Sequence, residues 1–264
     1  KTDSINNRVD GFVDCDIDKG GELFLTEGRS ALGSIVLARN SEFQAAYPLR
    51  GKMINVLKNP LSKVFNNGEI VDIINLLGTG VEIKDKLTQH LPKFDINNLR
   101  WNKIICTADA DADGKQINVL ILTALYKLVP TIIKEGYVYI AQPPLFEIKV
   151  SDDEKYYALS ETERDIKVNE LKLNNKKYEI HRLKGLGETS KEIMYDTVCN
   201  PETRVLQKVT VEDVEKMSLA FSKWMDEEVD KRKQYIESNL YKYLVEPPVE
   251  DISYRKNIEN IQTA

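Results

Sequence analysis

The chain is poor in residues that cross-link proteins or bind soft metals: its 264 residues include three cysteines and two histidines. The cysteines, Cys15, Cys106 and Cys199, are widely spaced and odd in number. This pattern argues against a disulfide scaffold and a zinc site, and it suits a reduced, cytoplasmic protein. No apolar run reaches the ~18 residues that a membrane span requires, so we expect no membrane segment.

Acidic residues slightly outnumber basic ones in this chain. The net charge is −5, because 42 acidic residues outnumber 37 basic ones, and this sum argues weakly against a nucleic-acid partner. Residues 39–63 nevertheless carry basic residues with a single acid, Glu42; the basic residues are Arg39, Arg50, Lys52, Lys58 and Lys63. Because Pro48, Gly51 and Pro60 interrupt this segment, we expect much of it to be loop. Such a loop either contacts phosphates or is simply solvated.

Three carboxylates stand where an apolar strand gives way to a helix, in the stretch WNKIICTADADADG from Trp101 to Gly114. Residues 104–106 have the character of a buried strand, and residues 117–134 are apolar enough for a helix. The carboxylates are those of Asp109, Asp111 and Asp113. Three acids in so short a segment repel one another unless a cation lies between them, and Mg2+ prefers oxygen ligands. Since ligands bind outside the carboxyl ends of strands in open α/β sheets, the stretch predicts a magnesium site.

Two other interpretations of these aspartates remain open at this point. DADADG matches the start of an EF-hand loop, but that loop follows a helix and requires glutamate at its twelfth position, which here is Leu120. The aspartates would also fit a solvated acidic turn that caps the next helix. A cap would be the default for one aspartate, whereas three of them after a buried strand favour the metal site.

A second strand also ends in an acid. Glu22 to Thr26 (ELFLT) is predicted to be a short strand, followed by Glu27 and by a helix with Ser30 near its N-cap. If the two strands are parallel neighbours, Glu27 and the aspartates meet at one edge of the sheet. Glu27 would then be a general acid/base beside a metal site.

The rest of the chain predicts further elements around this edge. Strands are expected at 176–183 and 204–211, and in two pieces of 137–150 broken by Pro143–Pro144. Helices are expected at 69–77, 189–199, 210–225 and 227–244, with capping pairs Ser160/Glu163 and Thr189/Glu192. In the last helix, the expected buried side is Val229, Tyr235, Ile236 and Leu240. The turn Lys184-Gly-Leu-Gly187 precedes a helix and is a weak signal for an anion site.

Five motifs in order now resemble one protein family. They are ELFLTEGRSA, FQAAYPLRGKMINV, ICTADADADG, GYVYIAQPPLFEI, and LKGLGE followed by NPETRVLQKVTVED. The chain resembles the Toprim-containing C-terminal half of the B subunit of type IIA DNA topoisomerases, which include bacterial gyrase and topoisomerase IV and phage relatives. The resemblance implies an α/β fold, a Toprim Rossmann-like parallel sheet flanked by helices, with a smaller α+β C-terminal part. The implied division is a lead-in segment at 1–20, the Toprim domain at 21–150, its C-terminal extension at 151–244 and a tail or linker at 245–264.

The resemblance also implies roles residue by residue. Glu27 would be the general acid/base and a metal neighbour, while Asp109 and Asp111 would be metal ligands assisted by Asp113. The residues expected near the DNA backbone are Arg50, Lys52 and Lys184. The implied cofactor is Mg2+, with two ions expected, and ATP would be used only by an ATPase domain upstream of these residues.

The implied activity is shared with a partner. The family cleaves both strands of double-stranded DNA, passes a second duplex through the break and reseals it. The nucleophilic tyrosine belongs to the A subunit, so this chain would hold half an active site in a heterotetramer-like assembly. Because the chain starts at Lys1 without a methionine, we expect it to be a piece of a longer protein.

One position departs from the family pattern, and two rival functions remain open. Where the family commonly has Glu-Gly-Asp-Ser-Ala-Gly-Gly, this chain has EGRSALG, so Arg29 reverses a charge two residues from Glu27. A stand-alone Toprim nuclease would cut DNA with Mg2+ without a partner. A catalytically silent DNA-binding piece would keep its DNA affinity after Asp109→Ala.

Overall fold

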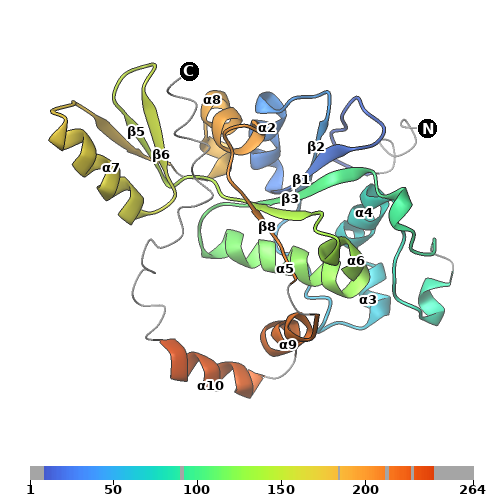
Figure 1. The fold of residues 1–264 in the computed structure, drawn as a ribbon. Coiled ribbons are helices and arrows are strands. Elements are labelled where there is room, and N and C mark those ends of the chain that lie inside the picture. Colours follow the sequence, from blue (N-terminus) through green and yellow to red (C-terminus); the bar gives the residue numbers. More distant parts are fainter. Residues whose placement is uncertain (1–8, 90–91, 184, 212–213, 227–228, 241–264) are drawn as a thin grey trace.

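A five-stranded sheet lies at the centre of the structure (Figure 1). The computed structural model describes residues 9–89, 92–183, 185–211, 214–226 and 229–240. The strand order is β2-β1-β3-β4-β8, with bounds β1 (Gly21–Glu27), β2 (Gln44–Leu49), β3 (Trp101–Thr107), β4 (Val138–Ala141) and β8 (Leu206–Lys208). The first four strands are parallel, and β8 runs antiparallel to β4. The predicted α/β fold with a mostly parallel sheet is therefore confirmed.

Helices cover both faces of this sheet, which explains why its strands read as continuous apolar runs. In β1, Leu23 and Leu25 belong to one core while Phe24 belongs to the other. The first core is closed by α3 (Leu61–Phe65), α4 (Gly68–Leu77), α5 (Ala112–Leu128) and α6 (Pro130–Lys134). The second is closed by α2 (Gly28–Ala38), α8 (Lys191–Met194) and the π-helix η4 (Tyr195–Cys199). Short 3-10 helices lie at η1 (Lys86–Thr88), η2 (Ile96–Asn98) and η3 (Leu186–Glu188).

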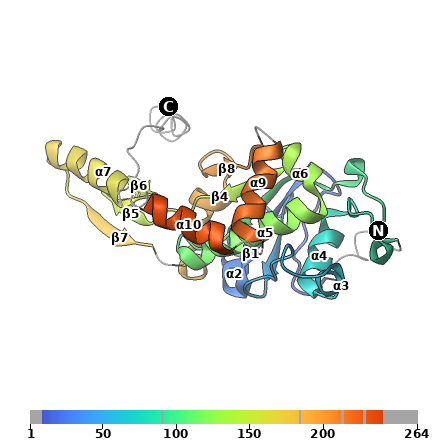
Figure 2. The same cartoon turned by 90° about the horizontal axis from the view of Figure 1, so that it is seen from below.

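A small α+β unit stands to one side of the main sheet (Figures 1 and 2). It has three antiparallel strands in the order β6-β5-β7 and one helix: β5 (Phe146–Lys149), β6 (Lys155–Ala158), α7 (Glu161–Leu173) and β7 (Glu179–Arg182). Val168 and Leu171 of α7 pack on Ile148 of β5. After this unit the chain returns to the main sheet as β8. This strand falls within the range 151–244 that was predicted to form the C-terminal extension. The division at residue 150 stays a prediction.

The last two described helices are only partly packed. α9 (Val214–Met225) lies against α5, where the rings of Phe221 and Tyr126 stack at 4.3 Å. In α10 (Val229–Asn239) the predicted buried side is wrong for three of its four residues: the exposed fractions are 46% for Val229, 47% for Ile236 and 50% for Leu240, a residue just beyond the helix. Tyr235 is half-buried, with its ring 5.0 Å from that of Trp224. The exposure has a physical reason, because few elements pack on this charged helix. The predicted tail at 245–264 lies outside the described residues, and among those that are described no helix is long and apolar enough to cross a bilayer.

We expected much of the segment 39–63 to be loop; residues 39–43 and 50–60 lie outside helices and strands, but the strand in its middle was not predicted. Residues 44–49 form β2, which is buried throughout. Pro48 suggested a loop, but β2 is the outermost strand of the sheet, where a residue without an N–H group is tolerated. The strand is also bridged on its free side, since Val13 and Ala46 exchange backbone hydrogen bonds at 2.9 Å.

Several element boundaries also differ from the prediction. The helix expected at 117–134 begins earlier, at Ala112, and breaks at Val129, because Pro130 disfavours helical geometry in the residue before it. The helix after β1 starts at Gly28 with Glu27 at the N-cap, rather than near Ser30. The later capping residue is Ser190, not Thr189: its side chain accepts from the Ile193 N–H. The strands expected at 176–183 and 204–211 are shorter, at 179–182 and 206–208.

A buried ion pair joins the amino end of β1 to the segment before β8. The carboxylate of Glu22 accepts hydrogen bonds from both terminal nitrogens of Arg204 at 2.5 and 2.6 Å, and the exposed fractions of the two side chains are 5% and 3%. Lys103 and Gln44 complete the network at 3.1 and 2.9 Å. Burial raises the pKa of Glu22, but the hydrogen bonds and charge of Arg204 outweigh it, so the net pKa lies below its usual value.

Arg204→Gln is expected to lower the free energy of unfolding by about 3–5 kcal/mol at neutral pH, because it leaves the buried Glu22 carboxylate without its main partner. The loss should shrink in acid: a depressed pKa contributes stability above the unfolded-state value and loses it as the pH falls through the folded-state value. Urea denaturation from pH 7 to pH 3 measures both effects. Lys149→Gln, which breaks the surface pair with Asp152, is the control and should cost little stability. A loss that small for Arg204→Gln would contradict the prediction.

Candidate metal and DNA site

Glu27 and Asp109 lie together at the carboxyl edge of the main sheet. Glu27 is the last residue of β1, and Asp109 follows the neighbouring parallel strand β3 by two residues. The Glu27 Oε2 atom accepts a hydrogen bond from the backbone N–H of Asp109 at 3.0 Å. The two strands that precede these acids are therefore parallel neighbours, and their carboxyl ends lie at the same edge of the sheet. Ligands bind at this edge in parallel sheets.

The electrostatics of this edge favour a cation. Burial raises the pKa of the Glu27 carboxyl. The Asp109 N–H opposes this effect, but the negative charges of Asp109, Asp111 and Asp113 add to it, and the net pKa is raised. Neighbouring negative charges repel one another, and a bound cation would relieve this repulsion. Because the side chains offer only oxygen ligands, the set suits Mg2+.

Each aspartate also has a donor within the chain. Asp109 Oδ1 accepts from the Leu186 N–H at 2.8 Å, and Asp111 Oδ1 caps α5 by accepting from the Gly114 N–H at 2.8 Å. Asp113 Oδ1 pairs with the Lys52 ammonium at 2.9 Å. The three side chains thus turn to three different partners. Within the described ranges no group of three or more His, Cys, Asp or Glu side chains is already arranged around one point for a metal.

Two glycines allow the backbone to close around Asp109. A Cβ atom on Gly114 would lie 2.1 Å from the Asp109 carbonyl oxygen, so the first turn of α5 can pack this closely only at a glycine. A Cβ atom on Gly185 would lie 2.6 Å from Asp109 Oδ2. Gly185 and Leu186, in the turn before α8, therefore lie directly against Asp109, a contact that the weak anion-site signal of this turn did not predict.

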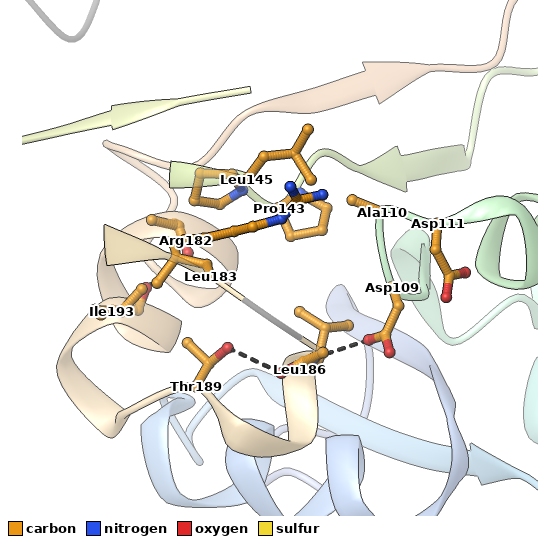
Figure 3. Close-up of a pocket in the computed structure, with 13 residues that line it drawn as sticks. Asp109, Ala110, Asp111, Pro143, Leu145, Arg182, Leu183, Leu186, Thr189 and Ile193 are labelled. Atoms are coloured by element: carbon orange, nitrogen blue, oxygen red, sulfur yellow. Dashed lines mark hydrogen bonds between the residues drawn. The ribbon is translucent and has the colours of Figure 1, made fainter. Parts of the chain in front are cut away.

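A cavity of about 320 Å3 opens beside Asp109 and Asp111 (Figure 3). It is lined on one side by these acids and on the other by residues around β7 and α8; among the lining residues are Pro143, Leu145, Arg182, Leu186, Thr189 and Ile193. Sequence reasoning did not single out Arg182. Its signal was faint, because it stands two residues before the basic turn and at the end of a polar strand.

The predicted DNA-contacting cations lie near the acidic edge, but each described one is paired. Arg50 is exposed and binds Asp10 at 2.9 Å, and the same Asp10 oxygen binds Arg29 at 3.1 Å. Lys52 binds Asp113, as described above. Lys184 lies outside the described residues. Asp10 was missed because it sits in a segment that had only been assigned as a lead-in, and nothing in its neighbourhood marks it.

Comparison with known proteins decides the family. The model of the Toprim domain matches residues 22–143, and the model described as DNA gyrase B subunit, carboxyl terminus, matches residues 175–237. The DNA gyrase B subunit of Mycobacterium leprae is 41% identical over 225 residues, and that of Thermus thermophilus is 40% identical over 230 residues. Its counterpart in Spiroplasma citri is 42% identical over 221 residues. The chain belongs to the DNA gyrase B family.

The extent of these matches places the chain within the family. They cover 84 to 86% of this chain but only 32 to 35% of the relatives' own length. The Toprim match runs from β1 to just beyond β4 and so contains Glu27 and all three aspartates, whereas the carboxyl-terminal match runs from before β7 into α10. The family resemblance drawn from the five motifs is therefore confirmed. The individual site residues stay predictions.

Proposed function

We propose that this chain is the Mg2+-binding Toprim part of a type IIA DNA topoisomerase, an isomerase that cleaves and reseals both strands of DNA. The observation that carries the proposal is the contact of the Glu27 carboxylate with the backbone of Asp109 at the ends of adjacent parallel strands. The relatives named as DNA gyrase B subunits support the reaction class.

The residues at the acidic edge would have different roles in this reaction. Asp109 and Asp111 would hold the metal, with Asp113 assisting, and Mg2+ when bound would stabilise negative charge on the phosphate and on the leaving oxygen. Glu27, whose pKa burial and the aspartate charges raise, would hold or accept a proton at Oε1 or Oε2. Arg50, Lys52 and Lys184 would contact the DNA backbone, the described two after exchanging their carboxylate partners for phosphates.

The partners follow from the same proposal. The nucleophilic tyrosine would come from an A-type subunit in a heterotetramer-like assembly on double-stranded DNA, and ATP would act only through an ATPase domain outside these residues. The buried tyrosine environments do not suggest a nucleophile: burial and the nearby Asp72 raise the pKa of Tyr47, whose hydroxyl donates to that carboxylate at 2.8 Å. All three cysteines are free and buried, which suits the reduced cytoplasm.

The chain alone is expected neither to cut nor to relax supercoiled plasmid, whereas an A-type subunit should restore Mg2+-dependent cleavage. The reason is that cleavage needs an activated nucleophile within reach of its base, and the proposal places that nucleophile on the partner. Supercoiled plasmid is incubated with Mg2+ and the chain, with or without the partner, then treated with detergent and protease and analysed on a gel. Protein should remain attached to the 5′ ends before protease. Linear DNA with free 5′ phosphates from the chain alone would instead establish a stand-alone nuclease.

A further inference from the structure

Arg182 differs from the other cations around the acidic edge. Arg29, Arg50 and Lys52 are each bound to a carboxylate of the chain. Arg182 lines the cavity beside Asp109 and Asp111, and its guanidinium has no hydrogen bond or ion pair with another side chain in the part of the chain that the structure describes. A guanidinium that no carboxylate of the protein neutralises is free to bind an anion from outside.

We propose that Arg182 binds a backbone phosphate of the DNA strand held at the acidic edge, with the cavity seating one nucleotide of that strand. This inference rests on the proposed function, since it names the part of the substrate that the cavity receives. The guanidinium group suits the role, because it offers paired N–H donors that match two phosphate oxygens.

Arg182 is exposed at the end of β7, and one aromatic ring restricts its side chain. It extends from the end of β7 across the cavity, toward the side that carries Ala110 and Asp109 (Figure 3). Its guanidinium carbon lies 5.8 Å from the centre of the Phe146 ring, on the neighbouring strand. Stacking on an aromatic ring restricts the side chain, so less freedom is lost when it binds a phosphate.

The remaining walls of the cavity suit the rest of a nucleotide. Pro143, Pro144 and Leu145 supply an apolar wall, and Leu186 and Ile193 another. The acids stand across the cavity from β7, on the side toward which Arg182 extends (Figure 3). The cavity of about 320 Å3 thus offers three kinds of surface to one DNA strand. The apolar walls suit the sugar and base, Arg182 suits the phosphate, and the acidic edge would hold the metal at the cleavage centre.

The test measures DNA binding as well as cleavage. The chain, assembled with its A-type partner, is titrated against a fluorescein-labelled DNA duplex at fixed Mg2+ and several KCl concentrations. Arg182→Gln should weaken binding by roughly 10- to 100-fold and lower the slope of log affinity against log salt by about one unit. Arg182→Lys should keep the slope but bind more weakly than the wild type, because it retains the charge without the paired donors.

Arg164→Gln is the matched control. Arg164 also lies over Phe146, at 4.7 Å, and pairs with Asp165 at 2.8 Å, but it does not line the cavity. Its loss therefore removes a cation and a Phe146 contact outside the cavity and should leave the salt slope unchanged. If the wild-type assembly binds and cleaves DNA while Arg182→Gln has the wild-type affinity and slope, the phosphate subsite is wrong and the proposed function stands. If the wild-type assembly neither binds nor cleaves, both proposals fall. Unchanged thermal melting of the variants verifies that they are folded.

Discussion

Glu27→Gln is expected to lower the rate of Mg2+-dependent DNA cleavage by the reconstituted complex by about 100- to 10,000-fold, the usual contribution of a positioned acid or base. Glutamine keeps the size of the side chain, and its carbonyl oxygen can still accept the hydrogen bond from the Asp109 N–H. What it loses is the ability to take up or release a proton, together with one negative charge at the proposed metal site. The fold should therefore remain while the chemistry is lost.

Single-turnover cleavage of a labelled duplex measures this effect, and thermal denaturation verifies the fold. The matched control is Glu188→Gln, which removes the same charge from the exposed end of η3 and should change the rate less than about threefold. A cleavage rate for Glu27→Gln within that same range would show that Glu27 is not the acid/base. DNA affinity should be preserved in both variants, because neither substitution removes a cation that contacts phosphate.

The acidic edge was predictable because its signal is local in sequence. An apolar run followed by alternating aspartates places carboxylates at the end of a buried strand, whichever fold contains it. The ELFLT run before Glu27 gives the same signal a second time. Parallel neighbouring strands such as β1 and β3 need a helical crossover between them. The apolar periodicity of α4 already indicated such a helix in the connecting segment.

The partners of the charged residues were not predictable, because they depend on contacts between distant segments. Glu22 and Arg204 are separated by 182 positions, and each looks like an ordinary charged residue until β8 returns beside β4. Asp10 is 40 positions from Arg50 and carries no local pattern. The strand β2 was missed for a related reason: Pro48 weakens the local strand signal, and only the outer position in the sheet makes a proline acceptable there.

Gly185 shows how closely the basic turn and the acidic edge depend on each other. Its φ of −60° and ψ of 154° are open to any residue, so backbone strain does not require glycine at this position. What requires it is the approach of the Asp109 carboxylate, 2.6 Å from where a Cβ would stand. The next residue of the turn, Leu186, donates its N–H to the other oxygen of that carboxylate. An added methyl group would therefore push the Asp109 side chain away from the turn that holds it.

Gly185→Ala is accordingly expected to lower the cleavage rate of the reconstituted complex by about 100-fold, the loss that a displacement of about 1 Å can cause at a reacting centre. The affinity for Mg2+, measured by isothermal titration of the chain, should fall with it. Stability should change by under about 1 kcal/mol, since a short side chain can rotate away from the new methyl group. Gly33→Ala is the control: its Cβ would meet nothing within 4 Å, and alanine is the better helix former in α2, so cleavage should be unchanged and stability slightly higher. If Gly185→Ala cleaves at the wild-type rate with wild-type Mg2+ affinity, then the position of the Asp109 carboxylate against the turn does not determine the chemistry, and Asp109 is not the ligand proposed here.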